Sequence, residues 1–128
     1  MPTPAIEIDH VAIAATDSAR SARFLADLLG DVVVEPAGPD DDMTALRIGH
    51  DATLLYMTAP HTPRQHLALR VDGARFARAV AGLQARGIPY GNDPAAPENG
   101  ETADCLGSGG RVYFSDLDGH LIELVTSG

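Results

Sequence analysis

The sequence repeats one order of secondary structure, and this duplication limits the folds open to the chain. Residues 5–58 read as a strand, a helix and three strands, because apolar alternation gives way to a helical stripe and then to three short strand-like runs. Residues 66–126 repeat that order after a short connector at 59–65. The repeat predicts an α+β fold in which two β-α-β-β-β units pack into one domain spanning residues 1–128.

Turn and cap residues bound the expected elements of the first unit. The stretch "AIEIDHVAIAA" at 5–15 alternates as a strand does. A helix is expected over 16–30, with Asp17 or Ser18 as its cap and Gly30 at its end. The strands expected after it lie at 31–36, 43–49 and 52–58.

The second unit is expected to repeat these elements with one long insertion. A strand at 66–71 and a helix at 72–87 precede the remaining strands, which are expected at 88–91, 111–116 and 121–126. Residues 91–110 are rich in Gly, Pro, Asn and Asp and have no apolar period. Such a segment is either a plain connector or a lid that is mobile until substrate binds and then orders over a cavity.

Composition excludes several classes of function. The formal charge is -9, which disfavours nucleic acid and anionic membranes because both carry phosphate. All nine basic residues are Arg, so no mechanism can use a Lys base or Schiff base. The single Cys105 cannot form an internal disulfide, and no signal peptide or membrane span is evident. We therefore expect a cytoplasmic protein that acts on a small molecule.

Two histidines and one glutamate occupy positions that suggest a metal site. His10 and His66 lie at equivalent places in the two first strands, and Glu123 interrupts the apolar last strand of "VYFSDLDGHLIEL". Taken singly, a strand His is more often a hydrogen-bonded structural residue, and a strand Glu is more often solvated. Taken together, two imidazoles and one carboxylate can form a facial triad for a divalent ion, with positions left open for substrate.

Other polar residues are candidates for supporting roles. Tyr113 shares the face of Glu123, so its hydroxyl could hydrogen-bond an oxygen on the metal; a structural Tyr is the alternative. Arg70 lies on the His66 face and could hold a substrate anion, unless it is simply an exposed strand end. His120 faces away from Glu123 and fits a turn, as do the histidines in the two connecting segments, His50 and His61.

These segments resemble the vicinal oxygen chelate (VOC) superfamily, also described as the glyoxalase/bleomycin resistance protein/extradiol dioxygenase family. "IDHVAIAATDSARSARFLADLLG", "HLALRV" and "VYFSDLDGHLIEL" are similar to its first strand and helix, its fifth strand and its C-terminal signature. The resemblance implies paired βαβββ modules curling mixed sheets around a metal cavity, with ligands at His10, His66 and Glu123. Module one would span 5–58 and module two 66–126.

The chain lacks parts that the best-known reactions of this superfamily use. Glyoxalase I usually adds a Glu ligand near the position of Leu54, where no acid is available. Extradiol dioxygenases carry a His shortly before the residue matching Tyr113, and fosfomycin-resistance transferases use a Thr at the position of Ala12 and a Lys in the later loop. The reaction type therefore stays open among isomerase, lyase, transferase and dioxygenase.

The expected function is a metalloenzyme that chelates two neighbouring oxygens of a small substrate. Fe(II), Mn(II), Ni(II) and Zn(II) all suit two His and one carboxylate. A homodimer is expected, with the metal site either within one chain or completed across the interface. The alternative is a metal-free binding protein of the bleomycin-resistance kind, which the acidic charge would suit.

Overall fold

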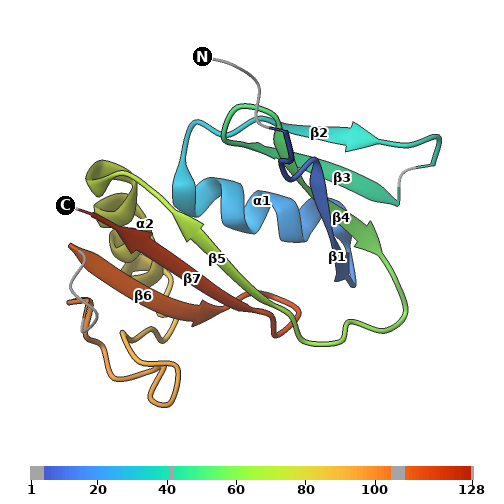
Figure 1. Ribbon diagram of the computed structural model, residues 1–128. Coiled ribbons are helices and arrows are strands. Elements are labelled where there is room, and N and C mark those ends of the chain that lie inside the picture. The colour runs from blue at the N-terminus through green and yellow to red at the C-terminus, as the bar shows by residue number, and fades with distance from the viewer. Residues whose placement is uncertain (1–4, 41, 105–108, 128) are drawn as a thin grey trace.

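The computed structural model describes residues 5–40, 42–104 and 109–127, and Cys105 lies outside them. Strands and helices follow the duplicated order (Figure 1). The elements, in chain order, are β1 (His10–Ala15), α1 (Ser18–Leu29), β2 (Val34–Ala37), β3 (Met43–Ile48), β4 (Ala52–Thr58), β5 (His66–Arg70), α2 (Gly73–Ala85), β6 (Gly110–Ser115) and β7 (Leu121–Thr126).

The strands form two separate mixed sheets, one for each half of the chain. The first has the order β1-β4-β3-β2 and the second the order β5-β7-β6. In each sheet the first strand runs parallel to the last strand of its unit, and the other pairs are antiparallel. This arrangement confirms the predicted α+β fold with two mixed sheets and two helices, and the sheets do not close into a barrel.

One expected strand is absent and two begin later than predicted, of which β2 starts at Val34 rather than at residue 31. Residues 88–91 form no regular strand, and only Gly91 makes a bridge, to Tyr113. Pro89 has no N–H to donate to a ladder, while Ile88 packs against the core. The strand expected over 5–15 begins only at His10. Ile6, which alternation placed in that strand, is 91% exposed.

Aspartate side chains begin both helices. Asp17 Oδ1 accepts a hydrogen bond from the backbone N–H of Arg20 at 3.2 Å, and Asp72 Oδ1 accepts one from that of Arg75 at 2.7 Å. At its other end α1 stops at Gly30, whose φ of 76° is one that residues with a side chain rarely adopt. The expected cap and stop of the first helix are thus both present.

Both halves contribute to one hydrophobic core. The buried faces of α1 and α2 meet closely, because a Cβ added at Gly82 would lie 2.9 Å from Cδ2 of Leu28. The largest fully buried apolar side chains come from both sheets and both helices and are Leu25, Leu28, Leu46, Leu54, Tyr56, Leu83, Val112, Phe114, Ile122 and Leu124. Mainly aliphatic side chains from both halves are therefore enough to fill one shared core.

The turn between β6 and β7 ties the second half to the first. Oδ1 of Asp118 accepts hydrogen bonds from the backbone N–H of Thr16 at 3.0 Å and from its hydroxyl at 2.7 Å. Oδ2 of Asp118 accepts the hydroxyl of Ser21 at 2.7 Å. The aspartate thus satisfies polar groups at the start of α1 from a position about a hundred residues later in the chain.

His120 makes a second tie from the same turn. Its side chain is 1% exposed. The backbone N–H of Gln65 donates to Nδ1 at 3.0 Å, so Nε2 carries the proton and donates to the carbonyl of Ala14 at 2.7 Å. The imidazole therefore joins β1 to the connector that precedes β5. His120 lies in a turn, as expected, and it is not part of the group around Glu123.

Candidate functional site

His66 and Glu123 form a hydrogen-bonded pair on the second sheet. In the register of β5 and β7, Glu123 lies opposite Ala68, two residues beyond His66 on the same face. Nε2 of His66 is 2.8 Å from Oε1 of Glu123. The glutamate is 5% exposed, whereas the His66 side chain is 50% exposed. A nitrogen and an oxygen that share one proton in this way are donor atoms that a divalent ion can also take.

A partly buried arginine supports the other oxygen of Glu123. Arg111 Nη1 donates to Oε2 of Glu123, and its Nε donates to Oδ1 of Asp104 at 2.8 Å. The Arg111 side chain is 15% exposed and that of Asp104 has no exposed surface. Glu123 can therefore be buried without a metal, because Arg111 and His66 together satisfy both of its oxygens.

Sequence reasoning missed Arg111 and Asp104. The signal for Arg111 was present, because it lies two residues before Tyr113 in a strand and so shares its face. No pattern in the sequence places Asp104, which comes from the loop before β6.

Tyr113 lies where its strand register predicts. It sits directly opposite Glu123 in the pairing of β6 with β7, and its ring centroid is 6.0 Å from that of His66. Burial and, after it, the charge of Glu123 raise the pKa of the Tyr113 hydroxyl, while Arg111 acts in the opposite direction. The phenol is therefore protonated at neutral pH and can donate a hydrogen bond. The pKa of Arg111 is also raised, chiefly by its hydrogen bond to Asp104.

His10, the third expected ligand, lies on the other sheet. Its side chain is 55% exposed, and Nδ1 is 2.8 Å from Oδ2 of Asp9. Within the described ranges, no three His, Cys, Asp or Glu side chains are grouped so that they could hold a metal. One chain thus brings together two of the three predicted ligands, His66 and Glu123, and the participation of His10 stays a prediction.

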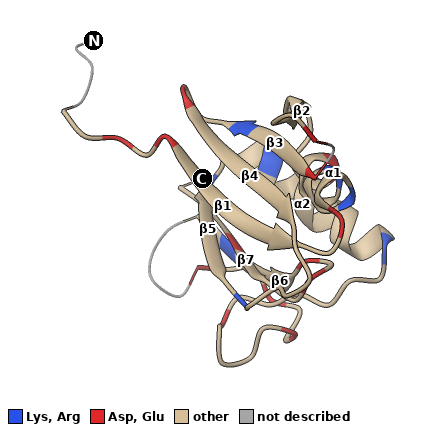
Figure 2. Cartoon of the chain, turned by 90° about the vertical axis from the view of Figure 1, so that its right-hand side faces the viewer, with Lys and Arg blue, Asp and Glu red and all other residues tan. Residues whose placement is uncertain are grey.

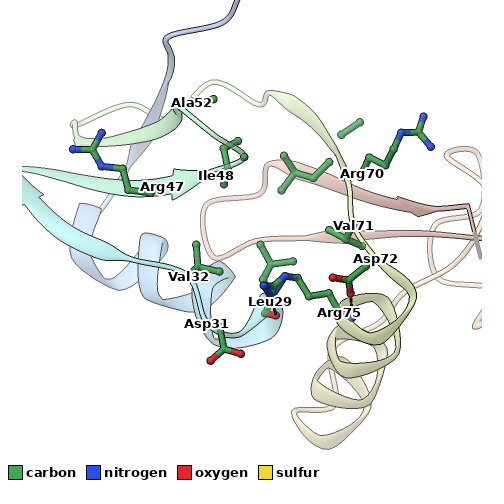
Figure 3. Close-up of a pocket in the computed structure, with 13 residues that line it drawn as sticks. Leu29, Asp31, Val32, Arg47, Ile48, Ala52, Arg70, Val71, Asp72 and Arg75 are labelled. Carbon is green, nitrogen blue, oxygen red and sulfur yellow. Dashed lines mark hydrogen bonds between the residues drawn. The ribbon is translucent and has the colours of Figure 1, made fainter. Parts of the chain in front are cut away.

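Arg70 lies at the far end of β5 from His66 and lines a groove between the two sheets (Figure 3). The groove has a volume of about 520 Å³. Leu29, Val32 and Ile48 line it, Arg70 and Arg75 come from one side, and Arg47 comes from the other. The Arg70 guanidinium makes a long 3.4 Å contact with the Ser127 hydroxyl.

The segment after α2 is bonded to the sheet at several points. Gly91 exchanges two backbone hydrogen bonds with Tyr113, at 3.1 and 2.7 Å. The N–H of Arg111 donates to the carbonyl of Thr102 at 2.9 Å. The lid expected over 91–110 stays a prediction, and any opening of its described part, 91–104, must break these bonds.

The next features are the distribution of basic residues, the two histidines outside the strands and the hydropathy of the helices. In Figure 2 the basic residues that are drawn lie at scattered positions, and no continuous basic face is visible from that side. His50 is exposed in the turn before β4, and His61 is exposed in the connector before β5. None of the helices in the described part has the length and apolarity that crossing a membrane requires.

A family model matches most of the chain. The profile described as Glyoxalase: Glyoxalase/Bleomycin resistance protein/Dioxygenase superfamily matches residues 7–124. No protein among those with curated functions matches the chain significantly. The match covers both sheets, both helices and all three expected ligands.

Solved structures resemble the whole chain. "Oxidase ChaP-H1" is 34% identical with a TM-score of 0.86, and the alignment covers 97% of this chain and 98% of that one. "Oxidase ChaP-H2" is 29% identical with a TM-score of 0.84, covering 98% and 96%. A glyoxalase/dioxygenase from Nostoc punctiforme is 21% identical with a TM-score of 0.69, covers 95% and 91%, and shares the fold.

Proposed function

Because the chain belongs to the Glyoxalase/Bleomycin resistance protein/Dioxygenase superfamily, we propose that it is a metal-dependent enzyme acting on a small substrate with two neighbouring oxygens. The observation that carries the proposal is the pair formed by His66 and Glu123, 2.8 Å apart on one sheet face. An imidazole and a buried carboxylate held together in this way can supply two of the three ligands of a facial triad.

The third ligand in this proposal is His10 of a second copy of the chain. His10 lies at the start of β1, at an edge of its sheet, and is too far from other candidate ligands of its own described chain to form a group of three with them. Its exposed side chain is available to a partner. A homodimer would then hold two sites, each with His66 and Glu123 from one chain and His10 from the other.

Oxygen-dependent oxidation is the reaction type that we favour. Two similar structures of 34% and 29% identity are named oxidases, and their alignments span nearly the whole chain. Two histidines and one carboxylate suit Fe(II), which can supply redox chemistry with dioxygen, although Mn(II), Ni(II) and Zn(II) also fit these ligands. This sequence lacks the extra groups of glyoxalase I and of the fosfomycin-resistance transferases, but it also lacks the His of extradiol dioxygenases, so the names of the two structures carry the preference.

Tyr113 and Arg70 would bind and orient the substrate. The protonated Tyr113 phenol, opposite Glu123, can donate a hydrogen bond to a substrate oxygen beside the ion. Arg70 shares the His66 face, but at the other end of β5, so it would reach only the distal part of a substrate that extends along the strand. An anionic group at that distal end would suit its guanidinium.

A second candidate function is metal-free binding, and one observation favours it. Both oxygens of Glu123 already have cationic or proton-donating partners, Arg111 and His66. A carboxylate satisfied in this way needs no ion. In that case the sheet face would bind a small ligand without chemistry, as bleomycin-resistance proteins do.

Metal titration separates the two functions. Protein prepared without chelator or affinity-tag metal should bind Fe(II) or Mn(II) at one ion per chain. Replacing His10, His66 or Glu123 by Ala should weaken binding by at least ~10-fold, because a three-ligand site tolerates loss poorly. The exposed His61→Ala variant is the matched control and should bind as the parent does. Absence of uptake by the parent protein would support the metal-free binder.

Mixing variants tests the shared site. An equal mixture of His10→Ala and Glu123→Ala proteins forms heterodimers with one intact and one doubly altered site. Because about half of the dimers are heterodimers after random subunit exchange, about a quarter of the parental uptake should return. No recovery after verified exchange would show that each chain builds its own site. A monomer by analytical ultracentrifugation would exclude the dimer.

A further inference from the structure

We propose that Arg111 is a positioning residue that restricts Glu123 to a single ligating oxygen. The inference rests on the proposed function, because it concerns how Glu123 would meet a divalent ion. The two oxygens of Glu123 have different partners: Oε1 faces Nε2 of His66 at 2.8 Å, whereas Oε2 accepts a hydrogen bond from Nη1 of Arg111. An ion could therefore take the place of the proton between Oε1 and Nε2, whereas Oε2 is held by Arg111.

The guanidinium is fixed where it lies. Nε of Arg111 is 2.8 Å from Oδ1 of Asp104, and Nη2 is 3.4 Å from Oδ2. The Asp104 side chain has no exposed surface, so moving the guanidinium away would leave a buried carboxylate without its counter-charge. The backbone N–H of Arg111 is also bonded, to the carbonyl of Thr102 at 2.9 Å. Arg111 is held by the carboxylates of Asp104 and Glu123 and by its place in β6. It therefore does not readily move away from Oε2 of Glu123 to let an ion bind there.

This arrangement has two consequences for an ion at His66 and Glu123. Ligation through one oxygen leaves a further coordination position for the substrate. A permanent positive charge beside the carboxylate also repels a divalent cation and draws electron density from its ligand, so it lowers the affinity of the site. The usual hydrogen-bonding partner of a metal ligand, a carboxylate or carbonyl behind a His, has the opposite effect and raises affinity.

The sign of the change in affinity therefore distinguishes Arg111 as a positioning residue from Arg111 as a merely structural one. If Arg111 only held the fold together, its loss would disorder Glu123 and weaken metal binding. If it restrains Oε2, its loss frees a second oxygen and removes a repelling charge. Binding should then become tighter even though the metal-free protein becomes less stable.

Three variants test the inference by Mn(II) titration, thermal unfolding and X-ray absorption of the Mn(II)-loaded protein. Arg111→Met removes the charge. Arg111→Met with Asp104→Asn removes both members of the buried pair, which leaves the net charge unchanged and serves if the single variant fails to fold. Arg47→Met is the control, because Arg47 also pairs with a glutamate, Glu35 at 2.6 Å, but on the other sheet.

Arg111→Met should bind Mn(II) at least ~10-fold more tightly than the parent protein, because repulsion is removed and a second oxygen is available. The double variant, whose net charge is unchanged, should also bind more tightly, because it frees the same second oxygen. Their metal-free melting temperatures should fall, and Mn(II) should raise them by more than it raises that of the parent. X-ray absorption should show a shorter distance from the metal to the carboxyl carbon, as two-oxygen ligation requires. Arg47→Met should match the parent in affinity and ligation.

Failure of the inference differs from failure of the proposed function. Parent protein that takes up no Mn(II) or Fe(II) overturns the metal site, and the role of Arg111 in ligation falls with it. Parent protein that binds while the Arg111 variants bind equally or more weakly, with unchanged ligation, overturns the inference and leaves the metal site standing.

Discussion

Replacing His120 by Ala should destabilise the fold more than any exposed histidine can. The imidazole is 1% exposed and makes two backbone hydrogen bonds, one to the carbonyl of Ala14 in β1 and one from the N–H of Gln65 in the connector. Truncation leaves the Gln65 N–H and the Ala14 carbonyl without those partners. Both bonds are only partly buried, so water can reach the two freed groups. At about 1.5 kcal/mol for each group, the loss should total about 3 kcal/mol.

Urea unfolding at one fixed protein concentration measures this loss, and calorimetry should show a melting temperature lower by roughly 10 °C. The concentration is fixed because association would add to the apparent stability. His50→Ala is the control, since His50 is exposed in a turn and its loss should change stability by no more than ~0.5 kcal/mol. If His120→Ala costs less than ~1 kcal/mol, or no more than the control, the two backbone bonds do not hold the halves together.

Further predictions concern the same turn, the packing of α2 and the long loop. Burial alone would raise the pKa of Asp118, but hydrogen bonds from Ser21 and Thr16 outweigh it and lower the pKa. Asp118→Asn should therefore cost about 2 kcal/mol at pH 7. A carboxyl whose pKa is lower in the folded than in the unfolded protein stabilises the fold only while it is ionised, and this stabilisation is lost as the pH falls. The difference in unfolding free energy between the parent and Asp118→Asn should therefore shrink below about pH 4, and a difference that stays constant would contradict the assignment. Gly110→Ala should cost about 1–3 kcal/mol in urea unfolding, because the added Cβ would lie 2.8 Å from the ring of Phe76, and an unchanged midpoint would show that the ring moves freely. In hydrogen exchange, substrate should slow the amides of 91–104, and equally slow exchange without substrate would count against a lid.

Periodicity in the sequence was sufficient to predict most of the fold. Strand alternation and helical stripes depend on local geometry, so the first helix, its Asp17 cap and the last two strands were all found within a residue or two. The strand expected at 88–91 failed because Pro89 cannot join a ladder. Residues 5–9 alternate like a strand, yet alternation does not say whether a neighbouring strand is present to pair with them.

The candidate site could be predicted only in part. The placement of Tyr113 opposite Glu123 followed from counting residues across one hairpin. The Arg111 contact depends on a side chain reaching diagonally across that hairpin, and Asp104 approaches from a loop whose path has no repeating pattern. The position of His10 relative to the second sheet depends on how two units pack, which no local spacing encodes.

The ties made by the β6–β7 turn also set the order in which the chain can finish folding. The bonds from Asp118 to Thr16 join residues 102 positions apart, and the bond from His120 to Ala14 joins residues 106 positions apart. During synthesis the first half leaves the ribosome before Asp118 and His120 have been made. Until then, the polar groups at the start of α1 are hydrogen-bonded to water. Contacts so distant in sequence slow folding, because a long loop must close before any of them forms. A nascent chain that stalls before residue 118 would thus carry an incomplete first half as well as an unfinished second one.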